Sequence, residues 1–270
     1  MEKAASVSEL FSKSKFILSI LSVVVLMIGL VFKFLHWPGA SFLIVSSLFL
    51  IAILLIVSAI NQLIKKFDAQ KVFYPVLGAV FSLGVLFKIM HWPMANMMII
   101  FSMLGLAFAF AEFSFRIKKN ILSIIPALFS ITLIMMLFKI MHWPYSTTLL
   151  TVSYLTFALF TPLLIILRSI KIKQNYPNIA SQFLFIGLLS LFYLIIECCI
   201  ILPFQSFIFT PFELRLILLS ALFLILLFIL KDLKTNIVER KLEIEFKFLQ
   251  ALGGIYMIIL VIQVLIVAPL

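Results

Sequence analysis

Phe87-Lys88-Ile89-Met90-His91-Trp92-Pro93 is a string that returns unchanged at residues 138–144 and, in a close variant, at residues 32–38. The copies begin 55 and 51 residues apart, and together they hold all three histidines and all three tryptophans of the 270-residue chain. Repetition at such a spacing is typical of an internally duplicated structural unit. We therefore expect one unit to occur three times.

Composition excludes a water-soluble globular domain, because 65% of the residues are hydrophobic, 30 are Phe and only 11% are charged. A bilayer core of roughly 30 Å needs about 20 helical residues per crossing, so each long apolar run is interpreted as a membrane-spanning helix. The sequence predicts an all-α, polytopic transmembrane bundle of about nine helices. The runs are approximately 16–35, 40–60, 72–90, 95–115, 121–141, 146–167, 179–202, 213–230 and 248–268.

Charge predicts the orientation of these helices. The net charge of +11 would indicate a nucleic-acid partner in a soluble chain, but here the basic residues lie between apolar runs, so the expected partner is the lipid bilayer and not nucleic acid. With alternating crossings, one side holds four of the 21 Lys and Arg residues, namely Lys33, Lys88, Lys139 and Arg215, and the other holds the remaining 17 (21 minus four). The positive-inside rule then predicts a cytoplasmic N-terminus and, after nine crossings, a periplasmic C-terminus.

The repeats divide the chain into hairpins. We expect a cytoplasmic tail at 1–15, hairpins at 16–60, 72–115 and 121–167, and a further three-helix membrane region at 179–270. Each hairpin is a helix up, a short outer turn that carries the string, and a helix down. Because an even number of crossings separates successive units, they are predicted to be parallel repeats.

Four residues of each string have a physical role at a hairpin tip. Proline lacks an amide hydrogen, which suits the first turn of the descending helix, and tryptophan favours the headgroup level. Lysine and histidine three residues apart on a helix share nearly one face, so the pair could either anchor the tip in the interface or form a proton or ion site. The positions are Lys33, His36, Trp37, Pro38, Lys88, His91, Trp92, Pro93, Lys139, His142, Trp143 and Pro144.

The string, together with His36-Trp37-Pro38-Gly39-Ala40 in the first copy, resembles the membrane hairpin of the gliding motility protein GldL family, which carries a Lys-x-x-His-Trp-Pro-Gly-Ala turn. The resemblance extends over roughly residues 16–165. It implies a proton-driven motor subunit of the bacterial cytoplasmic membrane, of which several copies surround a partner's single helices. It also implies an acidic residue in the descending helix, for which Glu112 is the candidate.

Two acids lie inside apolar runs. Glu112 is four residues before Arg116, which favours an ordinary interfacial ion pair near the cytoplasmic face. Glu197 falls near the outer end of its helix, where an acid needs a partner, and we expect it to pair with a motif lysine or with Arg215.

Other function classes lack support in the sequence. No metalloprotease, hydrolase or phosphate-loop signature occurs, so we expect no enzymatic activity and no cofactor. The motif lysines would repel a cation from the histidines, so we expect no metal. The pattern favours a structural or accessory protein, a scaffold whose hairpins pack on a partner membrane helix or on each other. The alternative is a proton- or ion-conducting or transport protein that uses the Lys-His pairs.

Overall fold

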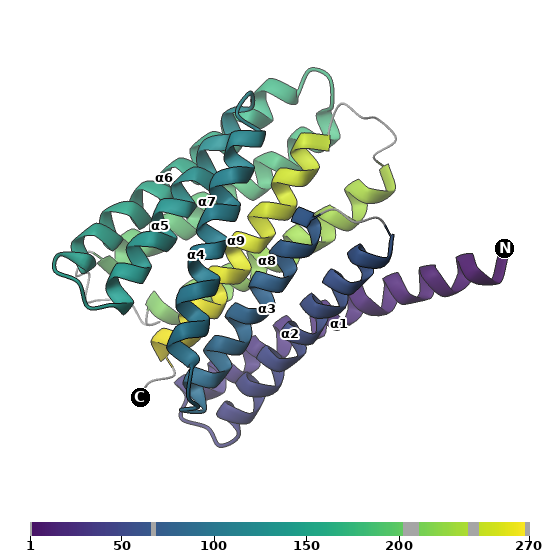
Figure 1. The fold of residues 1–270 in the computed structure, drawn as a ribbon. Coiled ribbons are helices and arrows are strands. Elements are labelled where there is room, and N and C mark those ends of the chain that lie inside the picture. The colour runs from purple at the N-terminus through teal and green to yellow at the C-terminus, as the bar shows by residue number, and fades with distance from the viewer. Residues whose placement is uncertain (1, 66–68, 202–210, 237–242, 268–270) are drawn as a thin grey trace. The chain divides into compact units, whose positions relative to one another are not determined.

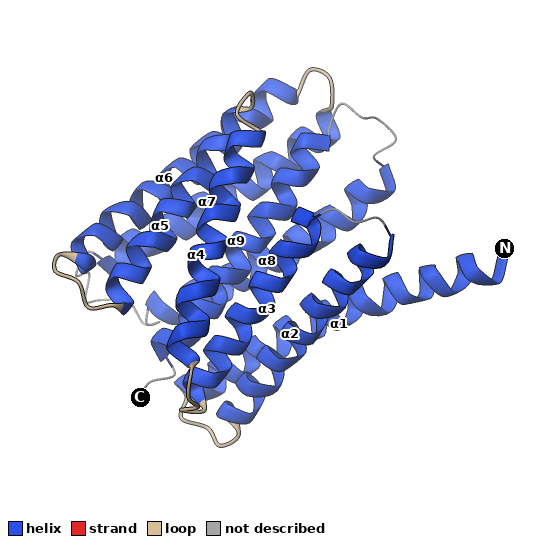
Figure 2. Ribbon diagram, viewed as in Figure 1, coloured by secondary structure: helices blue, strands red, loops and turns tan. Residues whose placement is uncertain are grey.

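The chain is a bundle of α-helices joined by short connections in a computed structural model that describes residues 2–65, 69–201, 211–236 and 243–267 (Figures 1 and 2). Some side chains near helix ends, including those of residues 199–217, are outside this description. No strand occurs among the described residues. The helices are α1 Glu2–Phe34, α2 Ala40–Lys65, α3 Ala69–Ile89, α4 Ala95–Arg116, the 3-10 turn η1 Ile121–Ser123, α5 Ile124–Ile140, α6 Ser146–Ile172, α7 Pro177–Ile201, α8 Pro211–Asn236 and α9 Glu243–Val267.

The helical prediction is confirmed. Within the described ranges, eight helices are long and apolar enough to cross a membrane, and the described apolar part of α8 is the shorter stretch Leu218–Leu230. Helix α1 runs through most of the segment that we expected to be a tail. Helix α9 begins at Glu243 rather than at 248, since acidic residues in a first turn interact favourably with the positive helix N-terminus, an effect that hydropathy does not register.

The described part of the chain forms two compact units. The first contains α1, α2, α3, the start of α4 up to Ser102 and residues from Val261 onward. Helix α2 packs against both α1 and α3, and Leu26 of α1 and Leu48 of α2 are fully buried. The tips of the first two hairpins lie at the same end of this unit, as parallel repeats require (Figure 1).

Glycines allow the two helices of the first two hairpins to approach closely. A Cβ atom added at Gly29 would lie 3.0 Å from the Ile44 backbone nitrogen, and one added at Gly84 would lie 3.1 Å from the Ile99 nitrogen. Both glycines stand three residues before the motif Phe. The third hairpin has Met135 at the corresponding position, so it lacks this glycine contact.

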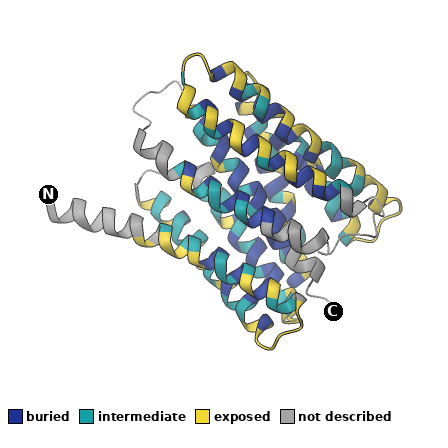
Figure 3. Ribbon diagram, turned by 180° about the vertical axis from the view of Figure 1, so that it is seen from behind, coloured by how far each residue is buried: buried dark blue, intermediate teal, exposed yellow. Residues whose placement is uncertain are grey.

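The second unit, Met103–Leu260, contains the rest of α4, η1, α5 to α8 and most of α9. Helix α6 packs against α5 and α7, and α7 packs against α8. Large aromatic side chains such as Phe129, Phe157 and Phe183 are almost fully buried in it. Buried and exposed positions alternate around the helices, so the outward faces present apolar side chains suited to lipid (Figure 3).

Candidate functional site

The motif ends each ascending helix in the same way. The backbone N–H of Trp37 donates to the Phe32 carbonyl over 2.8 Å, and that of His36 donates to the Lys33 carbonyl over 3.2 Å. This pair of bonds is the Schellman arrangement, which satisfies carbonyls left free at a helix C-terminus. The second copy repeats the two bonds at 2.8 and 3.3 Å, and the third at 3.1 and 3.2 Å.

The arrangement explains why histidine follows the helix. The residue just after a Schellman end must adopt a left-handed backbone, and His36, His91 and His142 have φ of 55°, 54° and 54°. Glycine usually fills this position, but histidine tolerates it better than most residues with a Cβ atom. The motif histidine is therefore selected at least in part by backbone conformation.

Phenylalanine and tryptophan complete the helix end. Their ring centroids lie 5.0 Å apart in the Phe32–Trp37 and Phe87–Trp92 pairs and 4.4 Å apart in the third copy. An apolar contact between these two positions commonly accompanies a Schellman end, and an aromatic pair adds about 0.5–1.5 kcal/mol beyond burial. Each tryptophan nonetheless remains about half exposed, at 53%, 49% and 51%.

The chain then turns into the descending helix through proline. In the third copy Tyr145, with φ 60° and ψ 5°, follows Pro144, and the Ser146 N–H donates to the Trp143 carbonyl over 3.3 Å. These features define a type II turn, which favours proline in its second position and needs a positive φ in its third. The third position is Gly39 in the first copy, with φ 87°, and Met94 in the second, with φ 68°.

Two expectations about the tip were wrong. The prolines do not lie in the first helical turn, because the descending helices begin two residues later, at Ala40, Ala95 and Ser146. The type II turn requires proline before the helix instead. The histidine of each Lys-His pair also does not stand on the helix, because it lies beyond the helix end in a left-handed conformation, although Lys33 and His36 still line one groove.

Two motif lysines bond across their own turns. Lys88 Nζ donates to Asn96 Oδ1 over 2.9 Å, and Lys139 Nζ donates to Thr147 Oγ1 over 2.5 Å. Both acceptors stand five residues after the motif histidine, and Ser41 occupies this position in the first copy. The sequence analysis missed these acceptors, although the recurrence of an oxygen-bearing side chain at one offset was a usable signal.

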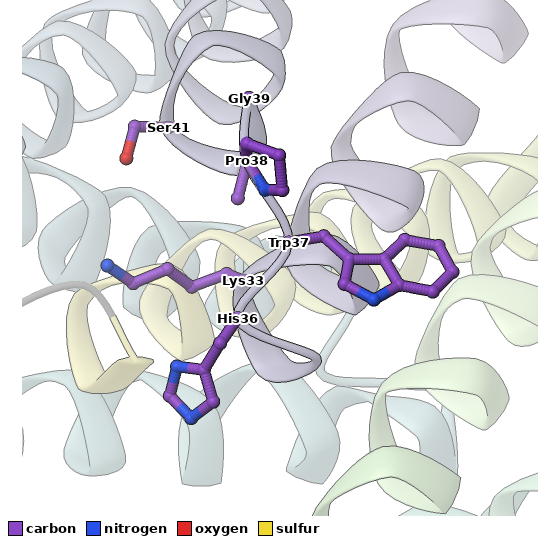
Figure 4. A pocket seen from close by; sticks show the side chains of 7 residues that line it. Lys33, His36, Trp37, Pro38, Gly39 and Ser41 are labelled. Atoms are coloured by element: carbon purple, nitrogen blue, oxygen red, sulfur yellow. The ribbon is translucent and has the colours of Figure 1, made fainter.

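At the first tip, the motif lysine and histidine and Ser41 line a groove of about 320 Å³. Lys33, His36 and Ser41 lie on one side of the turn, and Trp37 points to the other (Figure 4). All three histidines are exposed. Among the described residues, no three His, Cys, Asp or Glu side chains are grouped as metal ligands would be.

Glu112 forms the ion pair expected of it. Its Oε1 lies 2.6 Å from Arg116 Nη2, and both side chains are more than two-fifths exposed. The pairing is therefore an ordinary surface interaction within one helix, worth about 0.3–0.5 kcal/mol.

Glu197 is the most buried of the sequence-predicted site residues, with only 2% of its surface exposed. The Tyr154 hydroxyl of α6 donates to Glu197 Oε1 over 3.1 Å, and the same hydroxyl forms a very short hydrogen bond with that of Tyr193 on α7. The expected ion pair between Glu197 and Arg215 stays a prediction, because the Arg215 side chain lies outside the described residues. Both tyrosines were missed, because nothing in the sequence indicates that α6 and α7 meet at these positions.

A second polar network joins the opposite end of α6 to α9. Glu245, 2% exposed, accepts hydrogen bonds from Arg168 Nε over 3.0 Å and from Asn120 Nδ2 over 3.2 Å, and its contact with Arg168 Nη2 is shorter still. The Asn120 side chain also caps η1 through the Leu122 N–H. The sequence analysis did not predict that Glu245 would pair with Arg168.

These observations define the class of the protein: a multi-pass helical membrane protein built from repeated two-helix hairpins with a common tip. The family model of the GldL N-terminal domain matches residues 17–79 and again residues 73–123. No curated protein and no solved structure matches the chain.

Residues 17–123 of the chain are thus similar to the GldL N-terminal domain, in two overlapping segments. The two matches cover the first two hairpins, and the third copy shares their string and their tip geometry. The likeness relates the protein to gliding motility and suggests a bacterial inner membrane as its location. Its apolar helices indicate a lipid bilayer as their surroundings.

Proposed function

We propose that the protein is a non-catalytic structural or accessory module of the inner membrane, a scaffold whose rigid hairpins pack on each other, on further copies of the chain or on a partner's membrane helix. The rival is a conductor in which the Lys-His pairs guard an outer vestibule. The two differ in what the motif side chains do.

The observation that carries the scaffold proposal is the internal use of the motif at each tip. Phe and Trp pack on each other, and the histidine provides the left-handed residue that ends the helix. Lys88 and Lys139 bond to side chains of their own hairpins. The Phe, Trp and His of each string, and the lysine of the second and third copies, thus support a rigid turn, and a proton pathway is not needed to account for them.

The scaffold is expected to stand with its N-terminus in the cytoplasm and its C-terminus in the periplasm. The support is the charge count, in which 17 basic residues fall on one side and four on the other (21 in total). Alkaline phosphatase fused after Gly39, Met94 or Tyr145 should be active, and a fusion after Lys118 should be silent. The reverse pattern would contradict this orientation.

Flux through liposomes separates the scaffold from the conductor. The purified protein is reconstituted into liposomes that contain a pH dye, and a potassium diffusion potential is applied. We expect no acidification beyond that of empty liposomes. The informative variant changes His36, His91 and His142 together to Asn, because asparagine keeps the left-handed backbone while removing the imidazole. Acidification that this variant abolishes would establish the conductor instead.

A positive test concerns association. Cross-linking in membranes, followed by mass spectrometry, should detect stable contacts between copies of the chain or with another membrane protein. A protein recovered only as an isolated monomer at its native expression level would contradict packing on further copies or on a partner's helix, even if no flux were found.

A further inference from the structure

The first hairpin tip differs from the other two in what its lysine does. Lys88 and Lys139 each donate to a side chain of their own turn, whereas the described residues show no such bond for Lys33. Lys33 lines the groove of about 320 Å³ together with His36 and Ser41, and all three lie on one side of the turn (Figure 4). The ammonium group of this lysine is therefore available to a partner from outside the chain.

The hairpin contains no acidic residue that could neutralise this lysine. Residues 3–67 include no Asp or Glu, and residues 69–111, most of the second hairpin, include none either. A lysine at the end of an apolar helix extends its amine towards the interface, where it can reach water or an anion. The counter-ion of Lys33 accordingly comes from lipid or solvent.

The groove lies at the level of the membrane where phosphate groups are found. The apolar span of the ascending helix ends at Lys33, and that of the descending helix begins at Ala40, so the groove stands at the end of both. Trp37, on the other side of the turn, is 53% exposed, and tryptophan favours the headgroup level. In a phospholipid bilayer the anion at that level is the phosphate of the headgroup.

The side chains of the groove are hydrogen-bond donors of the kind that phosphate oxygens accept. The lysine ammonium and the serine hydroxyl both donate, and an imidazole ring carries an N–H in either protonation state. A bond from a charged donor to phosphate is shorter than a neutral one and roughly twice as strong. A Cβ atom added at Gly39 would meet nothing within 4 Å, so the turn itself leaves the space open.

We propose that the groove of the first tip binds a phosphate group, to which Lys33 donates a charge-assisted hydrogen bond and Ser41 and His36 donate further bonds. The level of the groove favours the headgroup of a membrane phospholipid as the source of this phosphate, and free phosphate is the other source. A bound headgroup fixes the first hairpin at the membrane surface. The proposal goes beyond the scaffold function and does not depend on it.

Native mass spectrometry of the full chain measures this binding. The purified protein in detergent is incubated with phosphatidylglycerol, with diacylglycerol, which has no phosphate, or with inorganic phosphate, and the retained amount of each is followed against its concentration. We expect saturable retention of phosphatidylglycerol and much weaker retention of diacylglycerol. Lys33→Gln should weaken the retention of a phosphatidylglycerol by about tenfold, because it removes the charged donor.

Two further variants separate this site from a general effect of charge. Lys88→Gln is the matched control, which removes the same charge from a lysine that already donates to Asn96, and it should leave the retention unchanged. Ser41→Asn places in the first turn the acceptor that Lys88 uses in the second, and it keeps every charge. This variant should bind phosphatidylglycerol as weakly as Lys33→Gln does, with circular dichroism and elution volume as in the wild type.

Competition identifies the source of the phosphate. Retention that inorganic phosphate reduces only in large excess supports a lipid headgroup, whereas retention of inorganic phosphate itself at micromolar concentration supports free phosphate at the same site. Equal losses in Lys33→Gln and Lys88→Gln, or equal retention of phosphatidylglycerol and diacylglycerol by the wild type, would overturn the proposal. Neither flux nor association is measured, so failure here is distinct from failure of the scaffold proposal.

Discussion

Replacing Tyr145 by glycine should stabilise the third hairpin. Tyr145 has φ 60° and ψ 5°, and its side chain is 82% exposed, so little packing is lost with the ring. A residue with a Cβ atom costs about 1–2 kcal/mol in this left-handed conformation, and glycine avoids that cost. The greater freedom of glycine in the unfolded chain offsets about 0.5–1 kcal/mol. The net expectation is a gain of about 0.5–1 kcal/mol in the free energy of unfolding.

Tyr145→Ala is the matched control. It removes the same ring and any interfacial anchoring by that ring, yet it keeps the Cβ atom and hence the strain, so it should not share the gain. The mirror experiment is Gly39→Ala at φ 87°, which should lower the free energy of unfolding by about 1 kcal/mol. Met94→Gly, at φ 68°, should behave like Tyr145→Gly.

The measurement is equilibrium unfolding of the purified protein in mixed micelles, with dodecyl sulfate as denaturant and tryptophan fluorescence as the signal. Variants are compared by their transition midpoints and slopes in parallel titrations. If Tyr145→Gly is no more stable than Tyr145→Ala, the left-handed backbone carries no measurable cost at this turn. The explanation of the tip as a strained type II turn would then be refuted.

The same unfolding assay tests the close helix approach and the second polar network. Gly84→Ala should lower the free energy of unfolding by about 1–3 kcal/mol, because the new Cβ atom would lie 3.1 Å from the Ile99 nitrogen. Gly254→Ala, where a Cβ atom meets nothing within 4 Å, should instead raise it by up to about 1 kcal/mol, and equal effects would contradict the packing argument. Glu245→Gln should cost about 3 kcal/mol, since it leaves a half-buried arginine without its counter-ion. Glu112→Gln, on an exposed pair, should stay within about 0.5 kcal/mol, and a similar loss in both would show that burial does not distinguish them.

The helices were predictable because their apolar runs are long and charge-free. A bilayer allows few alternatives to a helix for such a run, so composition and length suffice. Where charged residues enter a helix, the helix extends beyond its apolar run, as at the start of α9 and in the N-terminal part of α1, although the apolar span Phe16–Lys33 agrees with the prediction. Hydropathy measures membrane compatibility, whereas helix ends depend on caps and charges.

The tip was predictable as a motif but not as a geometry. A left-handed helix end is normally recognised by glycine, and histidine conceals it. The same holds for the following turn, in which only the first copy retains glycine, at position 39.

The polar clusters were beyond prediction for another reason, since Tyr154 and Glu197 are 43 residues apart and Arg168 and Glu245 are 77 apart. Sequence periodicity says which face of a helix is polar but not which helix it meets.

The position of Tyr154 in the repeat explains how one hairpin acquired a polar cluster. The residue 12 places after the motif histidine is Leu48 in the first copy and Met103 in the second, both fully buried, and Tyr154 in the third. The hairpin fold therefore does not need a hydroxyl at this depth, because two copies fill the site with apolar side chains. In the third copy this position faces Glu197 of α7, to which the Tyr154 hydroxyl donates. The tips have kept one geometry in all three copies, while the third copy alone carries a hydroxyl at this buried position, where it bonds to a buried acid.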